Sequence, residues 1–76
     1  MPYLSPVRRT DFEKFLLYVG CTLERTKGDH LIYKRAGTAR PIVITADREV
    51  APFIIRSNLR TLGMTVDEFL SIMARL

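Results

Sequence analysis

The sequence of 76 residues contains one cysteine, one histidine and no tryptophan. A single cysteine excludes an intramolecular disulfide, and Cys21 and His30 together provide too few ligands for a zinc motif. No segment approaches the roughly 18 consecutive apolar residues that a membrane-spanning helix needs. The N-terminus also lacks the apolar core of a signal peptide. We therefore expect a cytoplasmic protein with no structural metal, no cofactor and no membrane partner.

Basic residues outnumber acidic residues, and the excess is concentrated in one segment. The chain has 12 basic and 8 acidic residues, a formal net charge of +4. Residues 25 to 40 contain five basic residues and only one acidic residue, Asp29. The five basic residues are Arg25, Lys27, Lys34, Arg35 and Arg40. Such a cationic segment on a small domain suggests an RNA or an acidic protein as partner, and a solvated hairpin is the alternative explanation.

The length allows one domain over residues 1–76, in which residues 1–9, with Pro2 and Pro6, are expected to form an irregular leader. Thr10 and Glu13 have the spacing of a capping box, which predicts that a helix begins there and covers residues 11 to 19. Its buried stripe is formed by residues at positions i, i+3, i+4 and i+7. These are Phe12, Phe15, Leu16 and Val19. Gly20 is expected to end the helix.

The apolar period changes from helical to alternating after Gly20. Alternation over residues 21 to 35 predicts two strands, joined by a turn at Gly28 and Asp29. In this pattern Cys21 and Tyr33 are candidate core residues. A second turn at residues 36–39 leads to a β-branched third strand over residues 41–45. Residues 46–51 are expected to form a polar loop.

Two further helices follow the polar loop. The first has a stripe of Ile55, Leu59 and Leu62 and is capped by Gly63. The second begins with a capping box at residues 65–68, and its expected stripe is formed by Val66, Phe69, Leu70 and Met73. The sequence therefore predicts an α+β fold of order α-β-β-β-α-α, in which a three-stranded antiparallel sheet has its helices on one face. The other sheet face is then free for function.

His30 is the residue most suited to chemistry. If Tyr33 faces the helices, strand alternation turns His30 to the free face of the sheet. An exposed histidine beside cations can act as a general base on a ribose 2′-hydroxyl while Lys27, Lys34 or Arg25 holds the phosphate. The alternative is that His30 is only the first residue of an exposed strand.

The sequence also resembles a known family over residues 10 to 73. The resemblance rests on the hairpin Lys27-Gly28-Asp29-His30 with its following apolar strand, on Arg40-Pro41-Ile42-Val43-Ile44, and on the segment from Ile55 to Gly63. Together these segments resemble the HicA family of mRNA interferase toxins, so that residues 10–76 are HicA-like. The resemblance implies a double-stranded-RNA-binding-domain-like fold and the role of toxin in a type II toxin-antitoxin system. It also implies metal-independent endoribonuclease activity on mRNA, a catalytic His30 and a HicB-like antitoxin protein as partner.

The sequence departs from the family pattern at two points. Asp29 stands where the family usually has serine, and Thr45-Ala46-Asp47 stands where members often have Pro-x-His. The Asp29 carboxylate could favour a charged imidazolium and so oppose a base, or it could orient the ring. The first hypothesis is therefore an endoribonuclease, and the alternative is a non-catalytic RNA-binding module of the same fold. A third hypothesis is a subunit that binds only an acidic protein.

Eight further residues complete the predicted site. Those expected to contact RNA are Arg25, Lys27, Gly28, Lys34, Arg35 and Arg40. Arg56 and Arg60 are four positions apart on one helix, where like charges repel each other and gain from an anionic partner. That partner is either RNA or the antitoxin, and the alternative is a solvated helix face.

Overall fold

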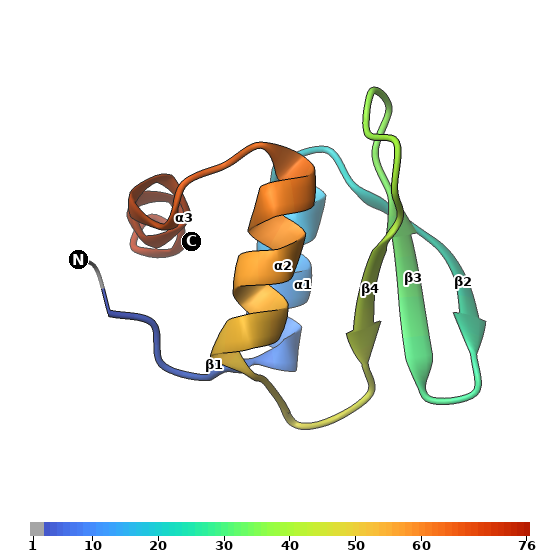
Figure 1. The fold of residues 1–76 in the computed structure, drawn as a ribbon. Coiled ribbons are helices and arrows are strands. Elements are labelled where there is room, and N and C mark those ends of the chain that lie inside the picture. The colour runs from blue at the N-terminus through green and yellow to red at the C-terminus, as the bar shows by residue number, and fades with distance from the viewer. Residues whose placement is uncertain (1–2) are drawn as a thin grey trace.

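The computed structural model describes residues 3–76 and contains eight helices and strands (Figure 1). In chain order these are β1 (Val7–Arg8), α1 (Arg9–Tyr18), β2 (Thr22–Lys27), β3 (His30–Lys34), β4 (Ile42–Thr45), β5 (Glu49–Val50), α2 (Pro52–Leu62) and α3 (Val66–Met73). Strands β2, β3 and β4 form an antiparallel sheet in that order. The predicted α+β fold is confirmed. No helix within residues 3–76 is long and apolar enough to span a membrane.

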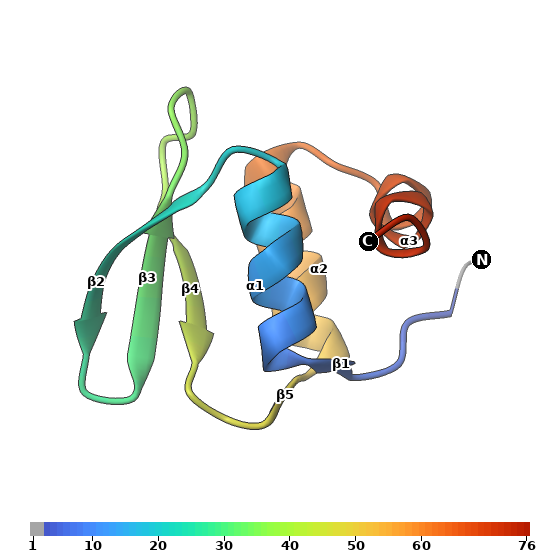
Figure 2. The same cartoon turned by 180° about the vertical axis from the view of Figure 1, so that it is seen from behind.

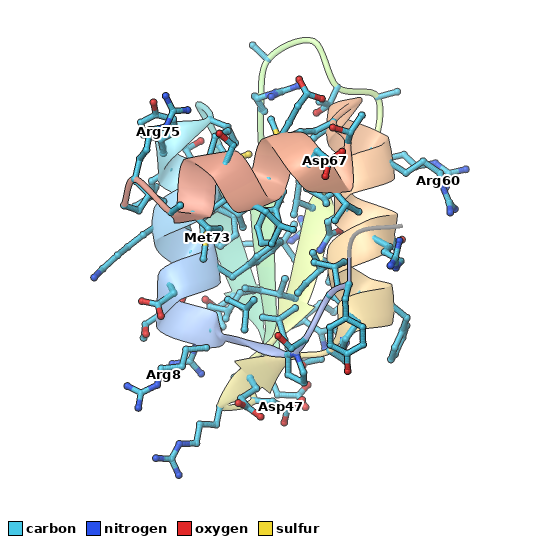
Figure 3. The ribbon with its side chains drawn as sticks, turned by 90° about the vertical axis from the view of Figure 1, so that its left-hand side faces the viewer. Arg8, Asp47, Arg60, Asp67, Met73 and Arg75 are labelled. Carbon is cyan, nitrogen blue, oxygen red and sulfur yellow. The ribbon has the colours of Figure 1, made fainter. Side chains whose placement is uncertain are left out.

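The elements form layers. Helices α1 and α2 lie side by side against one face of the sheet, and α3 crosses them on the side away from the sheet (Figures 1 and 3). Strand β2 is farthest from the helices in both side views (Figure 2). Phe12 and Phe15 of α1 meet Phe69 of α3, and their ring centroids are 4.7–5.9 Å apart. All three rings are fully buried, so burial of apolar surface holds α3 on the helical layer.

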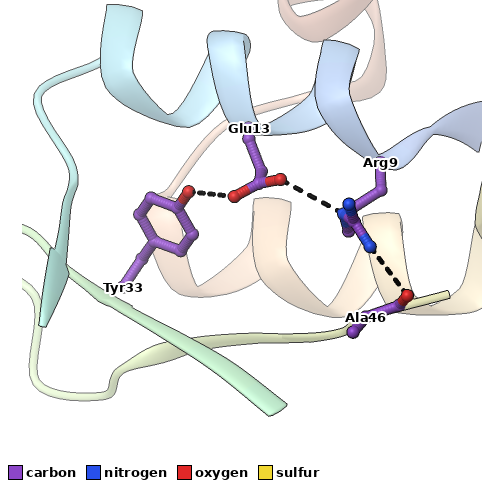
Figure 4. A network of polar contacts seen from close by, with 4 residues as sticks. All are labelled: Arg9, Glu13, Tyr33 and Ala46. Carbon is purple, nitrogen blue, oxygen red and sulfur yellow. Dashed lines mark hydrogen bonds and ion pairs between the residues drawn. The ribbon is translucent and has the colours of Figure 1, made fainter. Parts of the chain in front are cut away.

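The start of α1 differs from the prediction. The helix begins at Arg9, its N-cap is Arg8, and no side chain caps it. The capping box at Thr10 was therefore wrong. The Glu13 carboxylate instead accepts hydrogen bonds from the Arg9 guanidinium, at 3.2 Å, and from the Tyr33 hydroxyl (Figure 4). Arg9 also donates to the Ala46 carbonyl oxygen at 2.7 Å, so these contacts tie α1 to β3 and to the end of β4.

Two short strands occur where an irregular leader and a polar loop were predicted. Val7 pairs with Val50, and Arg8 pairs with Glu49, which joins β1 to β5. Leu4 is also buried in the core. The first two residues of the predicted leader lie outside the described residues.

Strand β2 is an exposed edge strand. Leu23 pairs with Tyr33 and so shares its face, yet 47% of Leu23 is exposed. Strand β2 extends beyond the cover of the helices, which leaves Leu23 outside the core. The register between β2 and β3 shifts between Leu23 and Arg25, which places a bulge at Glu24.

The last two helices follow the prediction closely. Gly63 ends α2 with a left-handed φ of 69°, and the capping box of Thr65 and Glu68 has both of its hydrogen bonds, at 2.9 and 3.1 Å. One stripe residue differs: Leu70 is exposed, whereas Ile72 packs against the core.

Candidate active site at the hairpin

The hairpin between β2 and β3 presents His30. Gly28 occupies the first position of its two-residue turn with φ +60°, a conformation that side-chain-bearing residues rarely adopt. The Ala46 amide donates to the Asp29 carbonyl oxygen at 2.7 Å and so extends the pairing between β3 and β4 beyond His30. The backbone on both sides of His30 is therefore held in place.

His30 faces away from the helices. Tyr33 lies in the core, whereas His30 and Ile32 have the opposite parity on β3; neither belongs to the core cluster, although Ile32 is itself buried. The His30 side chain is 53% exposed. The predicted orientation of His30 is confirmed, and we call this surface of the sheet the open face.

Three polar side chains surround His30 on the open face. Lys27 of β2 and Thr45 of β4 are its direct cross-strand partners. Asp29, in the turn, places its Oδ1 3.0 Å from the His30 Nδ1. The Thr45 hydroxyl donates to the Asp47 carboxylate at 2.6 Å. The site therefore combines an exposed imidazole that has a carboxylate 3.0 Å from one nitrogen, a cation beside it and a hydroxyl on its other side.

Glu24 is a site residue that the sequence reasoning missed. Its carboxylate lies 2.8 Å from the Lys34 ammonium and 3.9 Å from the Arg25 guanidinium. The hydrogen bond from Lys34 lowers the pKa of Glu24, and both cations add to that effect. Two of the cations predicted to bind RNA therefore face a carboxylate, and this contact depends on the register between β2 and β3, which the sequence reasoning did not fix.

The last three cations of the basic segment lie at the other end of the sheet from the hairpin turn. The segment after β3 is opposite the hairpin turn in both side views (Figures 1 and 2). Lys34, Arg35 and Arg40 line a cleft of about 520 Å³ there. The Arg35 guanidinium donates to the carbonyl oxygens of Leu62, at 3.1 Å, and Val19, at 3.5 Å. Arg35 therefore caps the ends of two helices.

The outer face of α2 carries the other predicted arginines. Arg56 and Arg60 are exposed, and Arg60 projects outward from the helix (Figure 3). Phe53, which the sequence reasoning did not select, is exposed on the same helix. Asn58 lies on the inner side and donates to the Val43 carbonyl oxygen at 3.3 Å, which fixes α2 against β4.

Neither the cysteine nor an acidic cluster offers a second reactive centre within residues 3–76. Cys21 is buried, as predicted, and burial raises the pKa of its thiol. No group of three or more histidine, cysteine, aspartate or glutamate side chains in this part of the chain is arranged to hold a metal ion.

The fold and site define a class: a small α+β domain that presents one histidine from a hairpin on an uncovered sheet face. The sequence model described as the HicA toxin of bacterial toxin-antitoxin systems matches residues 9–64, from the start of α1 to the residue after Gly63. The chain belongs to this toxin family, and membership implies a cognate antitoxin. No significant match occurs among curated proteins or among solved structures.

Proposed function

We propose that this chain is the toxin of a type II system and an mRNA endoribonuclease acting in the cytoplasm. The observation that carries the proposal is the environment of His30: an exposed imidazole with Lys27 beside it and Asp29 at its Nδ1. Family membership supports the toxin role. The resemblance to HicA toxins supports RNA as substrate and a fold like that of double-stranded-RNA-binding domains.

The proposed reaction is transesterification within the RNA. The His30 Nε2 accepts the proton of a ribose 2′-hydroxyl, and the 2′-oxygen attacks the adjacent phosphorus. The bond from phosphorus to the 5′-oxygen breaks, and that oxygen leaves with a proton from solvent. The products are a 2′,3′-cyclic phosphate and a 5′-hydroxyl. The proton transfer is assigned to His30, and no metal has a part in it.

Asp29 has a positioning role in this proposal. A neutral histidine that donates its Nδ1 proton to the Asp29 carboxylate keeps Nε2 free as the acceptor. The 3.0 Å contact is compatible with that tautomer. Of the two effects considered for Asp29, orientation of the ring is the one that catalysis needs.

Lys27 holds the scissile phosphate in this proposal. As the direct cross-strand partner of His30, it can place its ammonium near a phosphate on the open face. Arg25 and Lys34 are shared with Glu24, and Arg40 lies at the distant cleft. We therefore assign these three to more remote phosphates.

The second candidate function is an RNA-binding module without catalysis. The same contact between Asp29 and His30 supports it, because a carboxylate at 3.0 Å also suits a charged imidazolium, which has no lone pair to accept a proton. In that case His30 would bind phosphate as a cation. The two candidates differ in whether RNA is cleaved.

The proposed partner is a HicB-like antitoxin that covers the open face around His30 and reaches Arg56 and Arg60. The open face has no covering element within residues 3–76 (Figures 1 and 2). An acidic partner would associate quickly with this basic surface and would block the site without a change in the toxin.

Expression in a bacterial host tests the proposal. Wild-type protein should arrest growth and degrade mRNA, whereas His30→Ala should be harmless and still folded, because an exposed strand residue contributes little to stability. Loss of the base should reduce cleavage about 100-fold or more. A wild-type protein that is as inert as His30→Ala, yet binds RNA with steep salt dependence, would leave the binding module as the function.

A further inference from the structure

A second cavity adjoins the candidate active site. It has a volume of about 350 Å³ and lies between the end of β4, the following loop and the start of α2. Thr45 lines it, and Thr45 is the direct cross-strand partner of His30. Thr45 therefore belongs both to the surroundings of His30 and to the lining of this cavity. We call it the Phe53 pocket.

The chemistry of the Phe53 pocket differs from that of the open face. Its lining includes the ring of Phe53, which is 72% exposed, and the acidic residues Asp47 and Glu49. Figure 3 shows Asp47 near the start of α2. Carboxylates repel a phosphate, whereas an aromatic ring with hydrogen-bond acceptors beside it suits a nucleobase that carries donor groups.

We propose that the Phe53 pocket binds a base of single-stranded RNA next to the scissile phosphate, a role that rests on the proposed endoribonuclease function. Lys27 and His30 then hold the phosphate and the 2′-hydroxyl, and the base stacks on Phe53. The Asp47 or Glu49 carboxylate accepts a hydrogen bond from the base. The pocket therefore favours bases with an exocyclic amino group over uracil.

The outer face of α2 is suited to contact the same RNA strand. Phe53, Arg56 and Arg60 are all exposed, and their spacing of three and four residues places them on one face of the helix. The face extends about 10 Å from Phe53 to Arg60. A strand that places a base on Phe53 therefore meets two cations along the same helix, where its next phosphates would be neutralised.

Binding of short single-stranded RNAs tests the pocket. All variants are made in a His30→Ala background, so that the RNA stays intact. Phe53→Ala should weaken binding about tenfold, since the loss of one stacked base costs that much or more, and Phe53→Trp should retain it. Tyr18→Ala is the matched control: Tyr18 is also an exposed aromatic residue, 58% exposed, but it lies at the far end of α1. Its loss should change affinity less than twofold.

A series of oligonucleotides, each with one abasic position, identifies the stacked base. One position should weaken binding to the parent protein and have no effect on Phe53→Ala. Uridine at that position should also bind less well than adenosine or cytidine. Equal binding of RNA by the parent and Phe53→Ala would overturn the pocket alone. A parent that binds no RNA at low salt would overturn the proposed function and the pocket with it. A Phe53→Ala defect confined to antitoxin binding would reassign the pocket to a protein contact.

Discussion

Substitution of Glu24 by glutamine should strengthen RNA binding. The Glu24 carboxylate lies 2.8 Å from the Lys34 ammonium, so Glu24→Gln removes the open face's own competitor for that cation. The pair is exposed to solvent and therefore weak, so its removal should raise the affinity for RNA only roughly two- to fivefold at low salt. If Lys34 then binds one more phosphate of a single strand, the slope of log affinity against log salt steepens by about 0.7.

The assay is a salt titration of RNA affinity, again in the His30→Ala background. Between 50 and 200 mM salt, Glu24→Gln should lose about 2.5-fold more affinity than its parent. Asp67→Asn is the control, since it makes the same charge change on α3, on the side of the molecule away from the sheet (Figure 3). Unchanged affinity and an unchanged slope for Glu24→Gln would show that Lys34 takes no part in RNA binding.

Three further predictions concern the framework of the site and its partner. Tyr33→Phe should cost about 1–2 kcal/mol at neutral pH, because the Tyr33 hydroxyl donates to the charged Glu13. Burial and Glu13 raise the pKa of Tyr33, so on a rise in pH the phenol ionises first in the unfolded chain, and the free energy of unfolding falls above about pH 10. In chemical denaturation, Tyr33→Phe should lose less stability than wild type over this alkaline range. Gly28→Ala should cost about 1–2 kcal/mol because of the φ of +60°, although space for a Cβ exists, and an unchanged denaturation midpoint would contradict that strain. Reversal of both Arg56 and Arg60 to glutamate should slow association with the antitoxin about tenfold in stopped-flow measurements and leave dissociation nearly unchanged, and association as fast as wild type would exclude these arginines from the interface.

Local patterns predicted the parts of the fold that local forces determine. Gly63 ends α2, and the capping box of Thr65 and Glu68 begins α3, because both features depend on residues within one helical turn. The capping box at Thr10 failed for a tertiary reason. The Glu13 carboxylate instead accepts hydrogen bonds from Arg9 and Tyr33. Because Tyr33 is distant in the sequence, the segment around Thr10 gives no sign of this competing hydrogen bond.

The position of His30 could be predicted from the sequence, but the arrangement of the basic residues around it could not. Strand alternation was enough to place His30 on the open face, and the turn residue Gly28 was enough to place it at a hairpin. The sequence did not predict which basic residues of this segment pair with other groups of the protein and which stay free for a partner. That distinction depends on the register that brings Glu24 of β2 to Lys34 of β3, and on the packing of two helix ends against Arg35.

The most direct test of the account is cleavage of a defined RNA by purified protein in the presence of a chelator. Wild-type protein should produce fragments with 2′,3′-cyclic phosphate and 5′-hydroxyl ends, and His30→Ala should produce them about 100-fold more slowly or not at all. Equal cleavage by the two proteins, or fragments with 3′-hydroxyl ends, would contradict the assignment of His30 as the base that activates the 2′-hydroxyl.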